Sequence, residues 1–377
     1  MVANKIVAHC ATPFLPETGS WIYNQMSKLK SYRPIALTQE ARNLEQFPLA
    51  DLFTAESLTG ERGFANRLWR RVIGQYLFYA DFLCTSGAVL IHAHHGFQGF
   101  RCLRAKRQTE LPMITSFYGA DATRFSRHKG WMSRFRKLFT EGERFLAEGS
   151  TMAEQLVKIG CPEKKIIIHH LGIDLDEISS AVNAGSKSEG EELRILICAS
   201  FREKKGIPDG IEATARAVAR TGAKVRLVLI GDGPGRLQVQ EALSQNNGLR
   251  VDRLGYVSYS RFLQELDRGH ILLQPSKTAA NGDSEGGAPV VLLDAQAARV
   301  PVVSTRHADI PEYVIDGEGG LLAAEKDIDG LTERLCDLLL DPGMRARMGD
   351  AGRKHVEEHY NAELQVPVLE SIYDDLT

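Results

Sequence analysis

The sequence predicts an α/β protein of two domains, each built around a parallel β-sheet. Three observations support this fold class. The chain has 377 residues, more than one ordinary hydrophobic core organises, and this length suits two domains. Short apolar runs alternate with segments of roughly 10 to 20 residues that suit helices, as in parallel sheets covered on both faces. The alternation restarts after a polar stretch, "NAGSKSEGEE" at 183–192.

Eleven strands are predicted, six before the polar stretch and five after it. The first series is KIVAHC (5–10), RPIALT (33–38), AVLIHAHH (88–95), PMITSFYG (112–119), RFLAEGS (144–150) and KIIIHH (165–170). The second series is LRILICAS (193–200), KVRLVLIGDG (224–233), LRVDRLGYV (249–257), HILLQPS (270–276) and VPVVST (300–305).

The polar stretch marks the expected domain boundary. Residues 1–182 are predicted to form the first domain and residues 183–359 the second. The final segment, 360–377, is expected to be a helix that crosses back to the first domain, with a kink at Pro367. Ligands of such sheets bind beyond the carboxyl ends of the strands, here in a cleft between the domains.

The composition indicates a globular protein without a membrane span. Hydrophobic residues make up 43% of the chain and charged residues 25%, and no apolar run reaches the roughly 18 residues that a spanning helix needs. The short apolar run near the N-terminus fits a first strand better than a secretory signal. The six cysteines form no C-x-x-C pair, which is typical of reduced, buried thiols. We therefore expect a cytoplasmic location.

The charge is distributed unevenly. Residues 1–185 hold 23 Lys and Arg against 17 Asp and Glu, whereas the rest holds 23 against 31. The positive excess is densest at 124–139, "RFSRHKGWMSRFRKLF", where basic residues interleave with Trp131, Phe135 and Phe139. This stretch predicts either an amphipathic helix that touches an anionic acceptor or anionic lipid at the inner face of the cytoplasmic membrane, or a solvated basic face whose aromatic rings point into the core. No nucleic-acid motif accompanies it, so nucleic acid is not an expected partner.

Two loops of the second domain carry residues suited to a phosphorylated sugar ligand. Arg202, Lys204 and Lys205 follow a strand, where cations can meet a diphosphate, although a solvated turn has the same composition. The stretch "NGDSEGGAPVVLLDAQA" at 281–297 places Glu285 and two glycines before a helix predicted to begin at Pro289. Glycine amides and a helix dipole favour an anion, and carboxylates accept hydrogen bonds from sugar hydroxyls.

Competing interpretations of these loops remain open. Glu285 can be a helix-end charge, and Asp294 can face solvent. The glycines at 231, 233 and 235 miss the spacing of the dinucleotide fingerprint, so a tight turn explains them better than an NAD site.

The chain resembles the retaining glycosyltransferases of family 4, which have the GT-B fold of two Rossmann-like domains facing across a cleft. The resemblance covers nearly the whole chain, and the order and spacing of its fragments are more specific than any one of them. The fragments are 14–26, 91–97, 115–121, 145–178, 200–207, 229–234, 254–258, 272–297, 300–305 and 308–322.

The resemblance implies a role for each matching residue. Glu285 looks like the first acid of the E-x7-E element, which contacts the transferred sugar, and Lys205 like the cation that balances the leaving diphosphate, with Arg202 as a possible helper. The donor-binding positions implied are Gly286 and Gly287 for the diphosphate, Asp294 for the ribose, Val257 for the base, and Ser200 at the family's arginine. The acceptor-side positions implied are Glu17, Thr18, His94, Tyr118 and Asp121.

The activity implied is transfer of a sugar from a UDP- or GDP-linked donor to a glycan or lipid-linked acceptor, without a cofactor or metal. Asp174 and Asp176 resemble a D-x-D metal motif, but they lie at the entrance to the interdomain linker, so we assign them no metal.

Three positions depart from the family pattern. Eight residues rather than seven separate Glu285 from Asp294, Ser200 replaces the arginine, and Tyr118 stands where many members have histidine. The imidazoles of "HAHH" can equally be held by backbone groups at a strand end. These departures keep a second hypothesis open, that of a catalytically inactive nucleotide- or glycan-binding homologue. A sugar-nucleotide epimerase is a weaker alternative.

Overall fold

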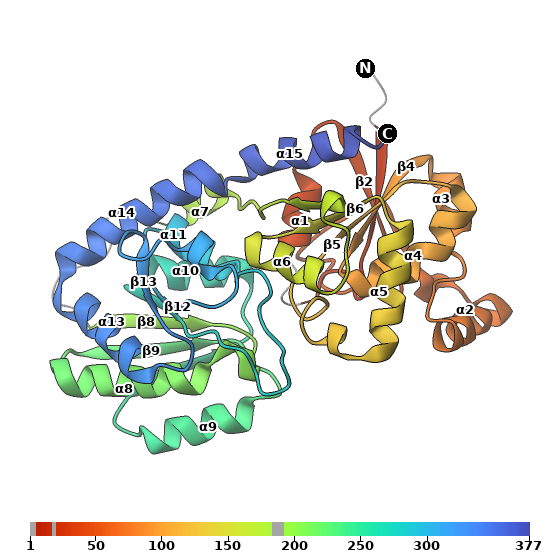
Figure 1. The fold of residues 1–377 in the computed structure, drawn as a ribbon. Helices are drawn as coiled ribbons and strands as arrows, with labels where there is room; N and C mark the ends of the chain where they lie inside the picture. Colours follow the sequence, from red (N-terminus) through yellow and green to blue (C-terminus); the bar gives the residue numbers. More distant parts are fainter. Residues whose placement is uncertain (1–4, 17–19, 183–191) are drawn as a thin grey trace. The chain divides into compact units, whose positions relative to one another are not determined.

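The computed structural model describes residues 5–16, 20–182 and 192–377. The chain divides into two compact units. The first comprises Met1–Gly172 together with Ala362–Thr377, and the second comprises Ile173–Asn361. The helices and strands of each are labelled in Figure 1.

A seven-stranded parallel sheet forms the centre of the first unit. In spatial order its strands are β3 (Leu52–Thr54), β2 (Tyr32–Thr38), β1 (Lys5–Cys10), β4 (Ala88–His94), β5 (Met113–Ser116), β6 (Arg144–Ala147) and β7 (Ile166–Ile168). Its α-helices are α1 (Ser20–Ser27), α2 (Gly60–Val72), α3 (Tyr79–Ser86), α4 (Gly96–Thr109), α5 (Lys129–Glu141), α6 (Ser150–Lys158) and α15 (Ala362–Asp374). Short 3-10 turns lie at η1 (Ala55–Ser57), η2 (Phe125–Arg127) and η3 (Glu163–Lys165).

A six-stranded parallel sheet forms the centre of the second unit. In spatial order its strands are β10 (Arg250–Gly255), β9 (Val225–Ile230), β8 (Leu193–Cys198), β11 (Ile271–Gln274), β12 (Val302–Thr305) and β13 (Gly320–Ala323). Its α-helices are α7 (Leu175–Ala181), α8 (Ile207–Thr221), α9 (Arg236–Gln245), α10 (Tyr259–Arg268), α11 (Val291–Ala297), α12 (Ile310–Tyr313), α13 (Ile328–Leu340) and α14 (Pro342–His359). The 3-10 turn η4 (Glu203–Lys205) follows β8.

Alternating residues of the second sheet bury their side chains in two separate cores. Leu196, Val228 and Leu272 pack into one core, which also contains residues of α10 and α11. Their chain neighbours Ile195, Leu227 and Ile271 pack into the other, which contains residues of α8 and α13. Since successive strand residues point to opposite faces, apolar residues at every position require helices on both faces. This explains why the predicted strands are continuous apolar runs.

The strand order reverses once in each sheet, between β1 and β4 in the first and between β8 and β11 in the second. At such a reversal the loops that leave two neighbouring strands diverge to opposite faces and open a crevice, where ligands of doubly wound sheets bind. Ligand-binding residues are therefore expected in the loops that follow these four strands.

All eleven predicted strands are present, and β3 and β13 are additional. Both are edge strands, of three and four residues. The unit boundary falls at Gly172 instead of residue 182, because Leu175 and Ile178 of α7 pack into the second unit's core. The C-terminal helical segment is interrupted at Tyr360–Asn361, and Pro367 lies inside α15. None of the described helices has the length and apolarity to cross a membrane.

Candidate active site

The candidate site of the second unit lies on the loops that leave β8 and β11, the two strands at the reversal of strand order. Glu285 is buried in the loop between β11 and α11, and Lys205 ends η4 after β8. The Lys205 Nζ lies 2.8 Å from Glu285 Oε1 and 2.9 Å from Oε2. Ser276, two residues beyond β11, donates its hydroxyl to Glu285 Oε1 at 2.8 Å. The reversal thus brings together an acid and a lysine that are 80 residues apart in sequence.

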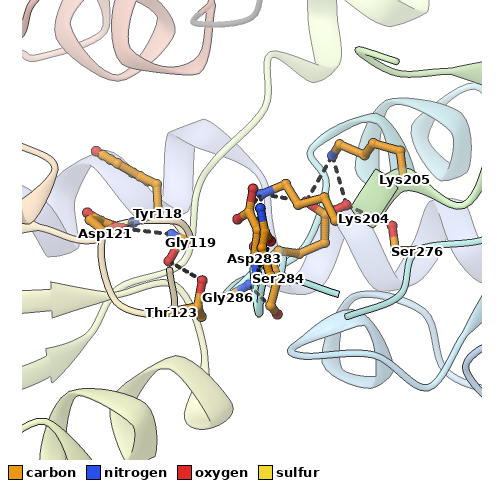
Figure 2. Close-up of polar contacts among 12 residues, drawn as sticks. Tyr118, Gly119, Asp121, Thr123, Lys204, Lys205, Ser276, Asp283, Ser284 and Gly286 are labelled. Carbon is orange, nitrogen blue, oxygen red and sulfur yellow. Dashed lines mark hydrogen bonds and ion pairs between the residues drawn. The ribbon is translucent and has the colours of Figure 1, made fainter. Parts of the chain in front are cut away.

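Lys204, the residue before Lys205, contacts the same loop (Figure 2). Its Nζ lies 3.5 Å from Glu285 Oε2 and 3.5 Å from Asp283 Oδ1, and it donates to the carbonyl of Ser284 at 2.8 Å. Two ammonium groups and two carboxylates therefore meet in a partly enclosed space. Such a cluster can bind a diphosphate through the lysines and a sugar hydroxyl through an acid.

Glu285 is ionised in this environment. Burial alone would raise the pKa of its carboxyl, but the ammonium groups of Lys205 and Lys204 outweigh burial and bring the pKa to about 2. At neutral pH the site therefore holds a carboxylate that accepts hydrogen bonds.

His307 fixes the backbone of the same loop. It follows β12, is almost fully buried, and its Nε2 accepts the backbone N–H of Glu285 at 3.1 Å. Because Nε2 is an acceptor, the proton of the neutral ring is on Nδ1, which lies 2.6 Å from Glu325 Oε1. Glu325 in turn accepts the N–H of Thr278 at 2.8 Å. The chain from Glu325 through His307 to Glu285 holds the acidic loop in place.

Gly286 and Gly287 do not lie at the N-terminus of α11, where the sequence placed them, and their binding of a diphosphate stays a prediction. Helix α11 begins at Val291, two residues after Pro289, so both glycines lie upstream of its first turn. The Gly286 amide donates to the Ser284 hydroxyl at 3.2 Å, within the loop. Gly286 has φ of 77°, a conformation that favours glycine, which explains this residue in the loop.

Asp294 lies in the first turn of α11 and is buried, so it is not the solvent-facing acid of the alternative interpretation. The Tyr259 hydroxyl donates to its Oδ1 at 3.0 Å. Burial raises the pKa of Asp294 to about 7, with the Tyr259 hydrogen bond opposing the rise and Glu177 adding to it. This acid is therefore partly protonated near neutral pH.

The other expected donor-side residues lie at the edges of this site. Arg202 is exposed at the N-cap of η4, and Ser200 is half-buried two residues earlier. Val257 is half-buried after β10 and packs against the core that contains α10 and α11. Within the described part of the chain, none of these three residues forms a hydrogen bond or ion pair with Glu285.

Five residues around the acids were not predicted as site residues: Ser276, Asp283, His307, Glu325 and Tyr259. Ser276 and His307 each follow the carboxyl end of a strand, and this position could have marked them as site residues from the sequence. No sequence feature marked Glu325 and Tyr259, because their contacts with His307 and Asp294 depend on which distant loops lie together in the fold.

In the first unit the expected acceptor-side residues form a second polar group. Tyr118, after β5, places its hydroxyl 2.7 Å from His94 Nδ1, and His94 Nε2 lies 2.9 Å from His9 Nδ1. His94 is fully buried, and burial together with the neighbouring ring of His92 lowers its pKa well below the usual value. The buried imidazole of His94 positions the Tyr118 hydroxyl, and a contact of either residue with an acceptor stays a prediction.

Asp121 braces the loop that carries Tyr118. Its Oδ1 accepts the N–H groups of Tyr118, Gly119 and Ala122 at 3.0 to 3.2 Å, and its Oδ2 accepts that of Gly96 at 2.9 Å. Figure 2 shows the same turn, closed by the Thr123 hydroxyl on the Gly119 carbonyl. A fully buried carboxylate with four amide donors is a structural anchor. Glu17 and Thr18 lie outside the described residues.

The basic stretch 124–139 matches the second of its two interpretations. Phe135 and Phe139 of α5 are buried in the core of the first unit, and Trp131 packs against that core. Lys129, Arg136 and Lys137 stay exposed. The exposed face of α5 is therefore basic and lacks the aromatic side chains that a membrane contact would use.

The two α/β units, each built on a parallel sheet, have the GT-B fold. Solved structures agree on this fold. HepE from Anabaena, in complex with UDP and glucose, superimposes with a TM-score of 0.79 at 14% identity and covers 99% of this chain and 100% of its own. Sucrose-phosphate synthase from Thermosynechococcus elongatus gives 0.74 at 16% identity, with 99% of each chain covered.

Sequence comparisons identify the family. Residues 34–177 match the model described as Glycosyltransferase Family 4, and residues 181–355 match that of Glycosyl transferases group 1. The putative colanic acid biosynthesis glycosyltransferase WcaL of Escherichia coli K12 is 31% identical over 72% of this chain and 67% of its own. The amylovoran biosynthesis glycosyltransferase AmsK of Erwinia amylovora is 30% identical over 75% and 69%. The chain belongs to glycosyltransferase family 4.

Proposed function

We propose that this glycosyltransferase moves a hexose, with retention of configuration, from a nucleoside-diphosphate sugar to a glycan or lipid-linked acceptor in polysaccharide biosynthesis. The observation that carries the proposal is the Glu285 cluster, in which an ionised acid and two lysines meet at the strand-order reversal. The relatives named for colanic acid and amylovoran biosynthesis support the polysaccharide pathway, and the complex of HepE with UDP and glucose supports a UDP-linked donor.

Each group then has a defined part in the proposed reaction. The acceptor oxygen forms a bond to the anomeric carbon on the face from which the diphosphate departs, and the bond from that carbon to the diphosphate breaks. The acceptor proton passes to the departing phosphate oxygen. Lys205 and Lys204 stabilise the charge that grows on the diphosphate, an effect that is largest in a site preorganised before reaction.

The two acids bind hydroxyl groups. Glu285 exchanges its hydrogen bond from Ser276 or Lys205 for one from a sugar hydroxyl, and Asp294 accepts from the ribose diol. A base and a metal are not needed in this scheme, because the leaving diphosphate takes the proton and the lysines balance its charge.

Donor binding and turnover should be measured separately on the purified protein. Thermal shifts with UDP, GDP, ADP and their sugars should single out one nucleotide, since a ligand at 100 times its dissociation constant stabilises by about 2.7 kcal/mol. Release of the nucleoside diphosphate with and without lipid-linked oligosaccharide, and the anomeric configuration of the product by NMR, then test transfer and retention. Stabilisation without any turnover of donor would favour the inactive homologue instead.

A further inference from the structure

Helix α2 of the first unit carries an exposed apolar stripe. Phe64, Leu68 and Val72 follow one another at intervals of four residues, which places them on one face of the helix. They are 62%, 51% and 68% exposed. Three large apolar side chains in a row, over about 12 Å of helix, are more than the scattered exposed residues that a soluble surface normally shows.

The opposite face of α2 holds the helix to the protein. Asn66 is buried, and its side chain donates to Gln39 Oε1 at 2.8 Å and accepts from the Leu77 N–H at 3.4 Å. Gly63 is buried against the Leu58 carbonyl so closely that a Cβ at this position would lie 2.3 Å from the oxygen. Because these anchors lie across the helix from the stripe, the fold itself directs the apolar side chains to the solvent.

The same helix is strongly cationic. It contains Arg62, Arg67, Arg70 and Arg71 and a single acid, Glu61. Arg67 and Arg71 follow Phe64 and Leu68 by three residues each and therefore lie beside the stripe. An apolar stripe edged by arginines matches a surface that is anionic outside and apolar just beneath, which is the interface of an anionic bilayer.

We propose that α2 docks the first unit on an anionic lipid surface. Phe64, Leu68 and Val72 enter the boundary between headgroups and acyl chains, and Arg67 and Arg71 pair with lipid phosphates. A second copy of this chain is a poorer occupant, because a symmetric contact of the two stripes would bring Arg67 and Arg71 of one helix near those of the other. The contact is distinct from the 124–139 stretch, whose aromatic side chains are in the core.

The purified full chain should co-sediment with sucrose-loaded vesicles of equal phosphatidylglycerol and phosphatidylcholine, and far less with phosphatidylcholine alone. Replacing the stripe in the variant Phe64→Ser/Leu68→Ser/Val72→Ser should weaken the partition coefficient by tenfold or more. The variant Arg67→Gln/Arg71→Gln should weaken it by roughly tenfold at 0.1 M salt and less at 0.5 M, since salt screens the attraction.

A matched control removes apolar groups that are equally exposed elsewhere. Leu237 and Leu340 are 73% and 66% exposed in the second unit, and Leu237→Ser/Leu340→Ser should bind vesicles like the wild type. All three variants change exposed side chains and should keep the wild-type circular dichroism. The proposal is overturned if the wild type does not sediment with anionic vesicles, or if the stripe variant sediments like the control. It is also overturned if light scattering shows that the stripe instead holds a dimer, lost in the stripe variant without lipid.

Discussion

Replacing Lys205 with methionine tests the electrostatics of the site most directly. Glu285 has a pKa of about 2 in the folded protein against an ordinary value of 4.5, and this difference corresponds to about 3 kcal/mol of stability at neutral pH. Because the folded pKa is depressed, the contribution is complete above about pH 4.5 and is lost as the pH falls towards 2. Lys205 is the nearer of the two cations, so its removal should cost about 2 kcal/mol of stability.

Lys205→Met should therefore lower the midpoint of thermal unfolding of the second unit by about 4 to 8 °C at pH 7. The double variant Lys205→Met/Glu285→Gln should recover most of this loss, because it also removes the buried charge that the single variant leaves less compensated. Sugar transfer should fall by about 10² to 10³ in both variants, since the proposed reaction loses a cation that stabilises the departing diphosphate.

Lys277→Met is the matched control. Lys277 pairs with Asp209 at 2.6 Å, is buried to a similar extent in the same unit, and has no bond to Glu285 among the described residues. This variant should lose stability and keep transfer. The reasoning is refuted if Lys205→Met unfolds at the wild-type temperature and turns over donor at the wild-type rate.

Three further predictions concern the other polar groups. Asp294 has a pKa of about 7, so it should bind a ribose diol less well as the pH falls below 7. The affinity for the preferred nucleoside diphosphate, measured by calorimetry, should therefore drop between pH 8 and pH 6. Asp294→Asn should flatten this pH dependence. Because the pKa of Asp294 is raised in the folded protein, the protein loses stability as the pH rises from 3.8 through 7. At pH 8, Asp294→Asn should therefore unfold at a higher temperature than the wild type. An unchanged or lower unfolding midpoint would contradict the buried, poorly compensated carboxyl. In the first unit, Tyr118→Phe and His94→Phe both remove the shared 2.7 Å hydrogen bond, and His94→Phe also removes the contact with His9. Both should reduce transfer, and the double variant should lose no more than His94→Phe alone. Additive losses, measured as kcat/KM, would show separate roles.

The sequence by itself determined which residues could act. All eleven strands named from the sequence are present, and the interior ones are mostly apolar runs because a strand covered on both faces buries the side chains at successive positions. The family motifs singled out Glu285, Lys205 and Asp294, and these are a buried ion pair and a buried acid. These features can be predicted from the sequence because they depend on local periodicity and on the spacing of motifs.

Only the tertiary structure decided how those residues are held. The strand order β8–β11–β12 brings Ser276, His307 and Lys204 to Glu285, although up to 81 residues separate them from it, and no local pattern records which strands will be neighbours. The same holds for the two amphipathic helices of the first unit. Both α2 and α5 combine arginines with large apolar side chains, but the surrounding core takes up the aromatic side chains of α5, whereas Asn66 turns the stripe of α2 outward. Which face of a helix is buried depends on what packs against it, and that is a property of the assembled fold.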